Sequence, residues 1–322
     1  AERECVKEGG VCNKIIAYEN LPYEFDNWEL KRYYAEKPIT GMKLIGVTVV
    51  NDGVRRGLKI ERAFLSSKIE QIVWLYENMP RIDFDTEIDW HEHHIVLRSE
   101  SDTSIQSDFA TYEIQYGAVK RASNDNTSWD AAKFETCAHK YIDVSEYGYG
   151  ISLLNDCKYG HSVRNGKIGL TLLTCGTYPN PEADQGKHKF TYSLMPHSGD
   201  YRTADVIGQA YLLNNPLIAK KTDGKGNLPA TYSFINCNNP AIVIETVKES
   251  EDGRGLVIRA YESFGSRVTC AFAVGFAIGN IYETDLLENK QTRIEHGTND
   301  FSCEFKPYEI KTYYIETANG NE

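Results

Sequence analysis

The densest group of metal-ligating side chains in the sequence is Asp89–His94, which reads DWHEHH. Imidazole and carboxylate groups are the usual protein ligands of zinc and its neighbours. On a strand, His91 and His93 would share one face, while Glu92 and His94 would take the other. Two interpretations stay open: a metal site on the His-x-His pair, and a solvated strand face whose imidazoles and carboxylates pair with one another. The second is simpler, and we assign no metal ligand in this chain.

A second candidate site is the polar loop that follows the apolar segment Gly150–Leu154. This loop carries Asn155, Asp156 and Lys158. Amide, carboxylate and ammonium groups suit sugar hydroxyls, and binding sites are commonly built on loops that rigid strands support. The alternative is an ordinary turn in which Asn155 and Asp156 bond their own backbone.

Other catalytic motifs are missing from the sequence. It contains no Gly-x-Ser-x-Gly nucleophile motif, and Gly224-Lys225-Gly226 lies in a polar loop rather than between a strand and a helix. No cofactor is therefore predicted for this chain. A pair of glycosidase carboxylates cannot be recognised from spacing, because the two acids meet only in space.

Most of the sequence has the pattern of β-strands. In Ile82–Trp90, apolar and acidic residues alternate, which predicts a strand with one buried and one acidic face. Lys68–Tyr76 and the Asn78-Met79-Pro80 break before this strand predict an antiparallel hairpin. Further strands are predicted at Leu44–Asn51, Ile95–Arg98, Tyr112–Ile114, Gly150–Leu154, Ile168–Leu173, Lys189–Leu194, Ala241–Thr246, Leu256–Glu262, Val268–Val274 and Glu309–Ile315. We expect an all-β protein in which sheets pack on sheets.

Two polar stretches, Lys220–Asn227 and Asn236–Pro240, indicate a domain boundary. We place it between residues 235 and 236. Residues 1–235 then form a large β-domain, and residues 236–322 have the length and strand rhythm of a small β-sandwich.

Charge and hydropathy exclude several classes of protein. The 322 residues include 35 basic and 46 acidic side chains, a formal charge of −11, which argues against nucleic acid as a partner. The longest apolar segment, Cys270–Ile278, is too short to cross a membrane and reads as a buried strand. Eight cysteines without a Cys-x-x-Cys motif are expected to be reduced and mostly buried, which favours a cytoplasmic protein.

Several multi-residue motifs resemble the C-terminal half of family 38 α-mannosidases, in particular their cytosolic and bacterial branch. The resemblance covers nearly the whole chain in order, with motifs at Asp83–His93, Asn126–Lys140, Tyr147–Gly160, Pro179–His188, Phe190–Asp200 and Ala241–Gly255. It implies a large antiparallel β super-sandwich of the galactose-mutarotase type, followed by a small β-sandwich.

The resemblance also implies what this chain lacks. Family members hydrolyse α-mannosides with retention, and their zinc ion, aspartate nucleophile and most sugar-binding residues belong to an N-terminal domain. One zinc-ligand pair there has a His-x-Asp form, and none of the eight histidines in this chain is followed two positions later by Asp. We therefore expect this chain to be inactive alone, with the N-terminal catalytic domain as its partner and α-mannoside oligosaccharides as the substrate.

Loops of the C-terminal domains close one side of the pocket in relatives, and motif position suggests which residues would do so here. They are Asn155, Asp156, Lys158, Asp184, His188 and, near the start of the chain, Asp26 and Trp28. One motif departs from the family pattern. Many relatives have Leu-Leu-Arg-Ser/Ala-Pro and then Pro-Asp-Pro, whereas this chain has Leu172–Gly176 (LLTCG) and Pro179-Asn180-Pro181. An Arg and an Asp are thus replaced by neutral residues, and if those residues touch substrate in relatives, a different linkage or aglycone preference is expected here.

Two other interpretations compete with an α-mannosidase fragment. A stand-alone carbohydrate-binding module would need an exposed aromatic platform, for which Trp28 and Trp129 are available, whereas Trp74 and Trp90 fit the core. A self-sufficient mutarotase-like enzyme would use a histidine and a carboxylate as acid and base.

Overall fold

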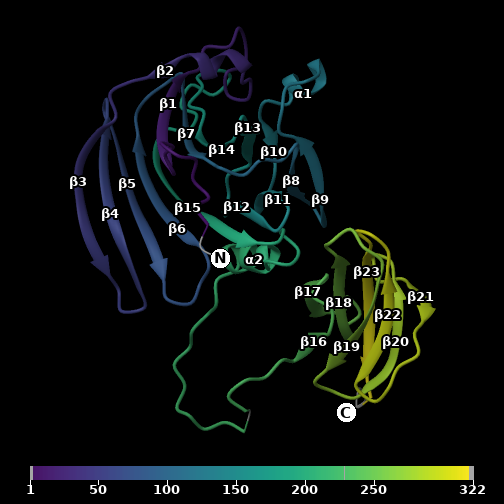
Figure 1. Ribbon diagram of the computed structural model, residues 1–322. Coiled ribbons are helices and arrows are strands. Elements are labelled where there is room, and N and C mark those ends of the chain that lie inside the picture. The colour runs from purple at the N-terminus through teal and green to yellow at the C-terminus, as the bar shows by residue number, and fades with distance from the viewer. Residues whose placement is uncertain (1–2, 228, 319–322) are drawn as a thin grey trace. The chain divides into compact units, whose positions relative to one another are not determined.

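The computed structural model describes residues 3–227 and 229–318. The chain divides into two compact units (Figure 1). The first unit comprises Ala1–Glu113 and Val119–Leu217, and the second comprises Ile114–Ala118 and Ile218–Glu322. The predicted boundary between residues 235 and 236 stays a prediction.

The first unit is built on two antiparallel sheets. The nine-stranded sheet has the order β3 (Lys43–Asn51), β4 (Arg55–Phe64), β5 (Ser67–Tyr76), β6 (Ile82–Trp90), β15 (Gly186–Ser198), β12 (Tyr149–Asn155), β11 (Tyr141–Glu146), β8 (Phe109–Ile114) and β9 (Gly117–Ala122). The six-stranded sheet has the order β10 (Thr136–Cys137), β13 (Gly160–Arg164), β14 (Lys167–Leu173), β7 (Ile95–Asp102), β1 (Lys14–Glu19) and β2 (Pro38–Ile39). This architecture confirms the predicted all-β fold and the hairpin β5–β6.

One core joins the inward faces of these sheets. Trp90 at the end of β6 is fully buried and stacks on Phe64 of β4, with ring centroids 5.8 Å apart. Trp74 is also buried, but it lies outside this core, on the acidic side of the sheet opposite Asp83, where its Nε1 donates a hydrogen bond to Asp85 Oδ2 (2.9 Å). The acidic face of β6 is not wholly solvated, because Asp83 is buried and its Oδ1 accepts a hydrogen bond from Arg81 Nε (2.9 Å).

The second unit is a small β-sandwich. A three-stranded sheet contains β16 (Ile235–Cys237), β19 (Val268–Val274) and β22 (Asp300–Phe305), and a five-stranded sheet contains β17 (Ile242–Glu249), β18 (Gly255–Glu262), β23 (Ile310–Thr317), β20 (Ile278–Thr284) and β21 (Lys290–Arg293). Phe272, Phe301 and Tyr313 form its aromatic centre. The segment expected to be one strand over Cys270–Ile278 is instead the end of β19, a turn and the start of β20.

Helices are short in this structure. The described residues contain α1 (Ser128–Ala132), the 3₁₀ helix η1 (Arg32–Glu36) and α2 (Val206–Asn214), which packs against β11 and β12. None of the helices in residues 3–227 and 229–318 has the length and apolar character needed to cross a membrane.

The expectation that most cysteines are buried is wrong. All eight carry free thiols, but only Cys175 and Cys270 are buried, while Cys12, Cys137 and Cys157 are exposed. Cys12 and Cys157 lie in loops rather than in sheet interiors, which explains their exposure.

Candidate functional site

Asp26 lies in the loop after β1 and is almost fully buried. Its Oδ1 accepts a hydrogen bond from the backbone N–H of Tyr178 (2.7 Å), and its Oδ2 accepts one from the N–H of Thr177 (2.9 Å). His94 Nδ1 lies 3.0 Å from Oδ2. Burial by itself would raise the pKa of Asp26, but the two amides and the nearby His94 outweigh burial and hold this pKa below its usual value. The carboxylate thus ties the loop after β1 to the segment after β14.

Asp184 binds the same segment after β14 as Asp26 does, but at its N-terminal end. Its Oδ2 accepts hydrogen bonds from the backbone N–H groups of Thr174 (3.0 Å) and Cys175 (3.2 Å). Burial would raise the pKa of Asp184, but these amides and His188 together lower it. His188 Nε2 lies 2.9 Å from the Asp184 carbonyl oxygen and donates a hydrogen bond to it. Asp26 and Asp184 therefore hold one segment, residues 174–178, from both ends.

Backbone strain concentrates in these loops. Phe25, His94, Cys175 and Asp184 have φ of 54°, 57°, 53° and 59°, in the left-handed region that disfavours non-glycine residues. Each costs about 1 kcal/mol or more, and the surrounding hydrogen bonds hold them, including one from His94 N–H to the Cys175 carbonyl (2.8 Å). At Gly176 a Cβ atom would lie only 2.4 Å from the Asp26 carbonyl oxygen, so the close approach requires glycine. Strain of this kind is typical of a binding site that the fold preorganises.

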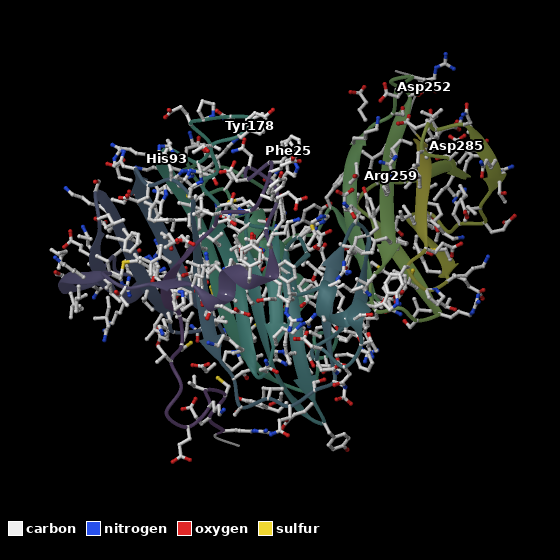
Figure 2. All side chains as sticks on the ribbon, turned by 90° about the horizontal axis from the view of Figure 1, so that it is seen from above. Phe25, His93, Tyr178, Asp252, Arg259 and Asp285 are labelled. Atoms are coloured by element: carbon white, nitrogen blue, oxygen red, sulfur yellow. The ribbon has the colours of Figure 1, made fainter. Side chains whose placement is uncertain are left out.

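An exposed aromatic group sits on these loops. Phe25 stacks on Trp28 with ring centroids 5.3 Å apart and planes 11° apart, and it contacts Tyr178 at 5.5 Å. Figure 2 shows Phe25 and Tyr178 beside each other at one edge of the first unit. Trp28 is 63% exposed. A cavity of about 380 Å³ opens here, with Tyr23 and Glu24 in its wall.

The loop after β12 is held by two buried residues, Asn155 and His161. Asn155 is buried, its Oδ1 accepts a hydrogen bond from the Lys158 N–H (2.5 Å), and its Nδ2 donates to the His139 carbonyl (2.6 Å). Below it lies His161, whose burial lowers its pKa to about 4, so the ring is neutral at pH 7. Asn155 thus positions the loop, as the ordinary-turn alternative had it, and its contact with substrate stays a prediction.

Asp156 and Lys158 stand on this loop against β15. Asp156 Oδ2 accepts a hydrogen bond from the Thr191 N–H (2.8 Å), while Lys158 Nζ lies 4.5 Å from the centre of the Phe190 ring. The other carboxylate oxygen of Asp156, Oδ1, is buried and has no hydrogen-bond partner within the described part of the chain. The neighbouring Cys157 thiol interacts with this carboxylate, because burial and then the Asp156 carboxylate raise the pKa of that thiol to about 11.

The structure brings together four of the seven predicted site residues, and it places the other three, Asn155, Asp156 and Lys158, on the loop after β12. The segment 174–178 joins Asp26 to Asp184, which bonds His188, and Trp28 packs beside Asp26 through Phe25. Phe25 and Tyr178 were missed from the sequence, and His94 was named there only as a possible metal ligand. Nothing in their local sequence marks their exposure, since it depends on how the loops at residues 25–28 and 174–180 fold.

Comparison with known proteins accounts for this architecture. The family model for the glycosyl hydrolases family 38 C-terminal domain matches residues 1–182, and that for the family 38 C-terminal beta sandwich domain matches residues 241–313. This chain belongs to glycosyl hydrolase family 38. The matched ranges fall on the larger part of the first unit and on the sandwich of the second.

Two relatives that match nearly the whole chain are named α-mannosidases. The chain is 39% identical over 321 residues to alpha-mannosidase 2C1 of Homo sapiens and 37% identical over 327 residues to alpha-mannosidase G of Dictyostelium discoideum. These alignments cover 96% and 97% of this chain but only 30% of each relative. The crystal structure of an alpha-mannosidase from Enterococcus faecalis V583 superposes with a TM-score of 0.76 at 18% identity, covering 95% of this chain and 38% of that one, which supports the fold.

The histidine-rich segment of this family 38 chain differs from the expected strand face. Strand β6 ends at Trp90, so the three imidazoles lie in a loop and take separate directions. His91 Nε2 lies 3.1 Å from Asp89 Oδ1, His93 Nδ1 lies 3.5 Å from the Gln185 amide nitrogen, and His94 faces Asp26. Within residues 3–227 and 229–318, no group of three or more His, Cys, Asp or Glu side chains is placed to hold a metal ion. The residues of this chain therefore do not fit the zinc ion that the family implies.

The motif that departs from the family pattern has a local structural role. Asn180 N–H donates to Asn27 Oδ1 (2.7 Å), and Asn27 Nδ2 donates to the Asn180 carbonyl (3.1 Å), so the two loops are joined by amides. The Thr174 hydroxyl lies 3.3 Å from Asp184 Oδ2. These neutral residues support the rim of the site, and their effect on linkage preference stays a prediction.

We predict that Asp156→Asn lowers kcat/KM of the full-length polypeptide for α-mannosides by about tenfold, because the loop that carries Lys158 loses the charge of this carboxylate. The free energy of unfolding should change by less than about 1 kcal/mol, because an amide oxygen can still accept from Thr191. Steady-state kinetics and urea denaturation measure both effects. Asp223→Asn, an identical change in the exposed polar segment, is the control, and unchanged kinetics for Asp156→Asn would remove this residue from the site.

Proposed function

We propose that this chain is the C-terminal part of an α-mannosidase that hydrolyses α-mannosides with retention of configuration. The observation that carries the proposal is the pair of relatives named α-mannosidases, which match this chain from end to end at 37–39% identity. Because the chain spans 30% of their length, we assign the catalytic carboxylates and the zinc ion to the remaining, N-terminal part of the polypeptide. That part is the proposed partner of this chain.

The described side chains fit a supporting role at the edge of a sugar pocket. Both oxygens of Asp26 and Oδ2 of Asp184 accept hydrogen bonds from backbone amides, so these carboxylates fix the loops. The exposed groups on those loops, Trp28 and Tyr178, present aromatic faces on which the apolar face of a sugar ring can stack. The ammonium group of Lys158, on the loop after β12, can bond sugar hydroxyls.

We also propose that the protein is cytoplasmic. All eight cysteines are free thiols in the structure, as expected for a reducing compartment. The sequence also resembles the cytosolic branch of the family.

The stereochemistry of hydrolysis tests the proposed reaction. We expect the full-length polypeptide to hydrolyse 4-nitrophenyl α-mannoside and to release α-mannose first, as a retaining mechanism requires. Proton NMR during the first minutes of reaction distinguishes the two anomers. Activity should be lost on removal of metal by a chelator and return with zinc. Initial release of β-mannose, or no hydrolysis of any α-mannoside, would contradict the proposal.

A second candidate function is carbohydrate binding by the isolated chain, which the exposed aromatic group favours. If it is correct, mannose oligosaccharides should bind the chain in calorimetric titration, and Trp28→Ala should abolish the signal. Trp129→Ala, at another exposed tryptophan, is the matched control. If the unaltered chain gives no heat of binding, the isolated chain is not a carbohydrate-binding module. The aromatic group would then act only as part of the full-length polypeptide.

A further inference from the structure

Two thiols of the second unit lie opposite each other inside its small sandwich. Cys270 on β19 and Cys303 on β22 are directly paired across the antiparallel strands, and their Sγ atoms are 3.6 Å apart. We propose that this pair is an oxidation site, at which hydrogen peroxide converts the two thiols into a reversible disulfide. The proposal does not rest on the proposed function, because the site lies wholly within the second unit.

Strand register places both thiols on the inner face of the three-stranded sheet. Side chains two positions apart on a strand point to the same side of the sheet. Phe272 is two positions after Cys270, and Phe301 is two positions before Cys303. These two rings are buried and stacked, with centroids 5.0 Å apart. Cys270 and Cys303 therefore form the next inward-facing pair along the same two strands.

The backbone geometry allows a disulfide between these strands. Directly opposite residues in an antiparallel pair have Cα atoms about 4.5 or 5.5 Å apart, depending on whether the pair is hydrogen-bonded. Both separations lie within the range of about 4.4–6.8 Å that disulfides span. The two sulfur atoms have to approach from 3.6 Å to about 2.05 Å, and rotation of the side chains can supply this movement.

Cys237, on β16, is the third thiol of this sheet and the alternative partner. It lies opposite Phe272, so it is only a diagonal neighbour of Cys270. Diagonal neighbours are about 7–8 Å apart, at or beyond the separation that a disulfide can bridge. The Cys270 thiol lowers the pKa of Cys237 to about 7, so peroxide can attack this thiol as well. The register nevertheless favours Cys303 as the disulfide partner of Cys270.

Cys303 has the surroundings of a reactive thiol. It is partly exposed, whereas Cys270 is buried. The Cys270 thiol is the main cause of a lowered pKa at Cys303, and this interaction outweighs the effect of burial. The Tyr313 hydroxyl and the Lys311 ammonium group lower the same pKa further, against the opposing charge of Cys237. Such surroundings favour the thiolate, which is the form that attacks peroxide.

Tyr313 gives Cys303 a hydrogen-bond donor. It projects from β23, in the five-stranded sheet, and its ring contacts Phe301 with centroids 5.1 Å apart. Its hydroxyl is buried, and apart from Cys303 no group in residues 3–227 and 229–318 is placed to form a hydrogen bond with it. Burial and the nearby Cys303 raise the pKa of Tyr313, so the hydroxyl keeps its proton and can donate a hydrogen bond to a thiolate.

The oxidation consumes one molecule of hydrogen peroxide. The Cys303 thiolate sulfur attacks one peroxide oxygen, the O–O bond breaks, and a sulfenic acid forms, while the departing hydroxide takes up the proton that Cys303 had released. The Cys270 sulfur then attacks the Cys303 sulfur, so the S–S bond forms, the S–O bond breaks, and the hydroxyl group leaves as water with the Cys270 proton. The two thiols lose two electrons, and the peroxide is reduced to two molecules of water. A small dithiol reverses the modification by thiol–disulfide exchange.

Peptide mapping of the full-length polypeptide tests the proposal. The folded protein is treated with hydrogen peroxide at pH 7, alkylated, and digested with trypsin without reduction. Lys290 and Arg293 lie between the two cysteines, so trypsin places them in separate peptides. We expect a disulfide-linked pair of peptides that contain Cys270 and Cys303, and we expect dithiothreitol to separate them.

Cys157 is the internal reference for reactivity. This residue is exposed, but partial burial of its thiol and the neighbouring Asp156 raise its pKa to about 11. It is therefore almost wholly protonated at pH 7, and we expect Cys303 to lose its free thiol at least about fivefold faster than Cys157 does.

Two tyrosine variants test the role of the hydroxyl group. Tyr313→Phe should slow the formation of the linked peptides by about threefold, because the thiolate loses a donor. Tyr314→Phe, the same change at the next residue, is the control, because its hydroxyl donates to Asp252 Oδ1 (2.9 Å) instead. Equal rates in the two variants would contradict the role of Tyr313.

The linked peptides identify the pair directly. A link between Cys270 and Cys303, found in the unaltered protein and retained in Cys237→Ser, supports the proposal. A link between Cys237 and Cys270 would overturn the assigned pair. Oxidation of Cys303 to a sulfinic acid without any link, or a link that forms only after the protein is unfolded in urea, would overturn the site itself. The map of the unaltered protein decides these outcomes even if a variant fails to fold.

Discussion

Replacing Asp26 by Asn should lower the free energy of unfolding of the first unit by about 2–3 kcal/mol. Both carboxylate oxygens of Asp26 accept hydrogen bonds from backbone N–H groups, those of Thr177 and Tyr178. An amide group would turn its NH₂ toward one of these donors, which then has no acceptor. The strained loops at Phe25 and Cys175 would lose the group that holds them, so turnover of the full-length enzyme should fall as well.

Urea denaturation followed by tryptophan fluorescence measures the Asp26→Asn effect. All four tryptophans lie in the first unit, so the signal reports that unit alone. Glu182→Gln, the same loss of charge at an exposed position in the neighbouring loop, is the control. A midpoint for Asp26→Asn that matches the control would contradict the role of this carboxylate.

The Asp26 contribution should also depend on pH. Its pKa is lower in the folded state than the usual value of 3.8, so the stabilisation is complete above about pH 4. It is lost as the pH falls through the folded-state pKa. The difference between the unaltered protein and Asp26→Asn should therefore shrink only in strong acid.

The second large effect concerns His161. Burial lowers its pKa to about 4 in the folded state, against 6.5 in the unfolded chain. The neutral ring donates from Nδ1 to the Tyr159 carbonyl (3.0 Å) and accepts at Nε2 from Asn155 Nδ2 (3.3 Å). Protonation of Nε2 would place its N–H group opposite the N–H group of Asn155 Nδ2, so that neither has an acceptor, and it would bury a positive charge.

The sign of the His161 effect follows from the lowered pKa. Stabilisation is complete above about pH 6.5 and is lost as the pH falls toward 4, by about 3 kcal/mol at roughly 1.4 kcal/mol per pH unit. His161→Gln should remove this slope, and His93→Gln, at an exposed histidine, should retain it. Urea denaturation of the first unit at several pH values between 7 and 4 measures the slope. An unchanged slope in His161→Gln would show that other groups cause the acid sensitivity.

Local patterns in the sequence predicted most strands, because apolar and polar residues alternate along a strand that has one buried and one exposed face. Ile82–Trp90 was predicted residue for residue, as was Val268–Val274. Helix α2 was not predicted, because its sequence VIGQAYLLN is apolar around most of its circumference and contains Gly208. The helical period of apolar and polar residues was therefore weak in this segment.

The candidate site was harder to predict from residues alone. Asp26 and Asp184 are 158 positions apart and meet only through the segment 174–178, so no spacing could connect them. The resemblance to the family selected both of them, and the structure gave them roles as loop anchors. Leu44–Asn51 was correctly predicted as a strand, but its exposure depends on what lies beyond the smaller sheet, which local sequence does not report.

The most direct test of the central proposal compares the isolated 322-residue chain with the full-length polypeptide. Both are assayed with 4-nitrophenyl α-mannoside and zinc at equal concentration, after circular dichroism has established that the isolated chain is folded. The proposal predicts hydrolysis by the full-length polypeptide and none above background by the chain alone. Turnover by the isolated chain would contradict it, because the catalytic groups would then lie among the residues described above.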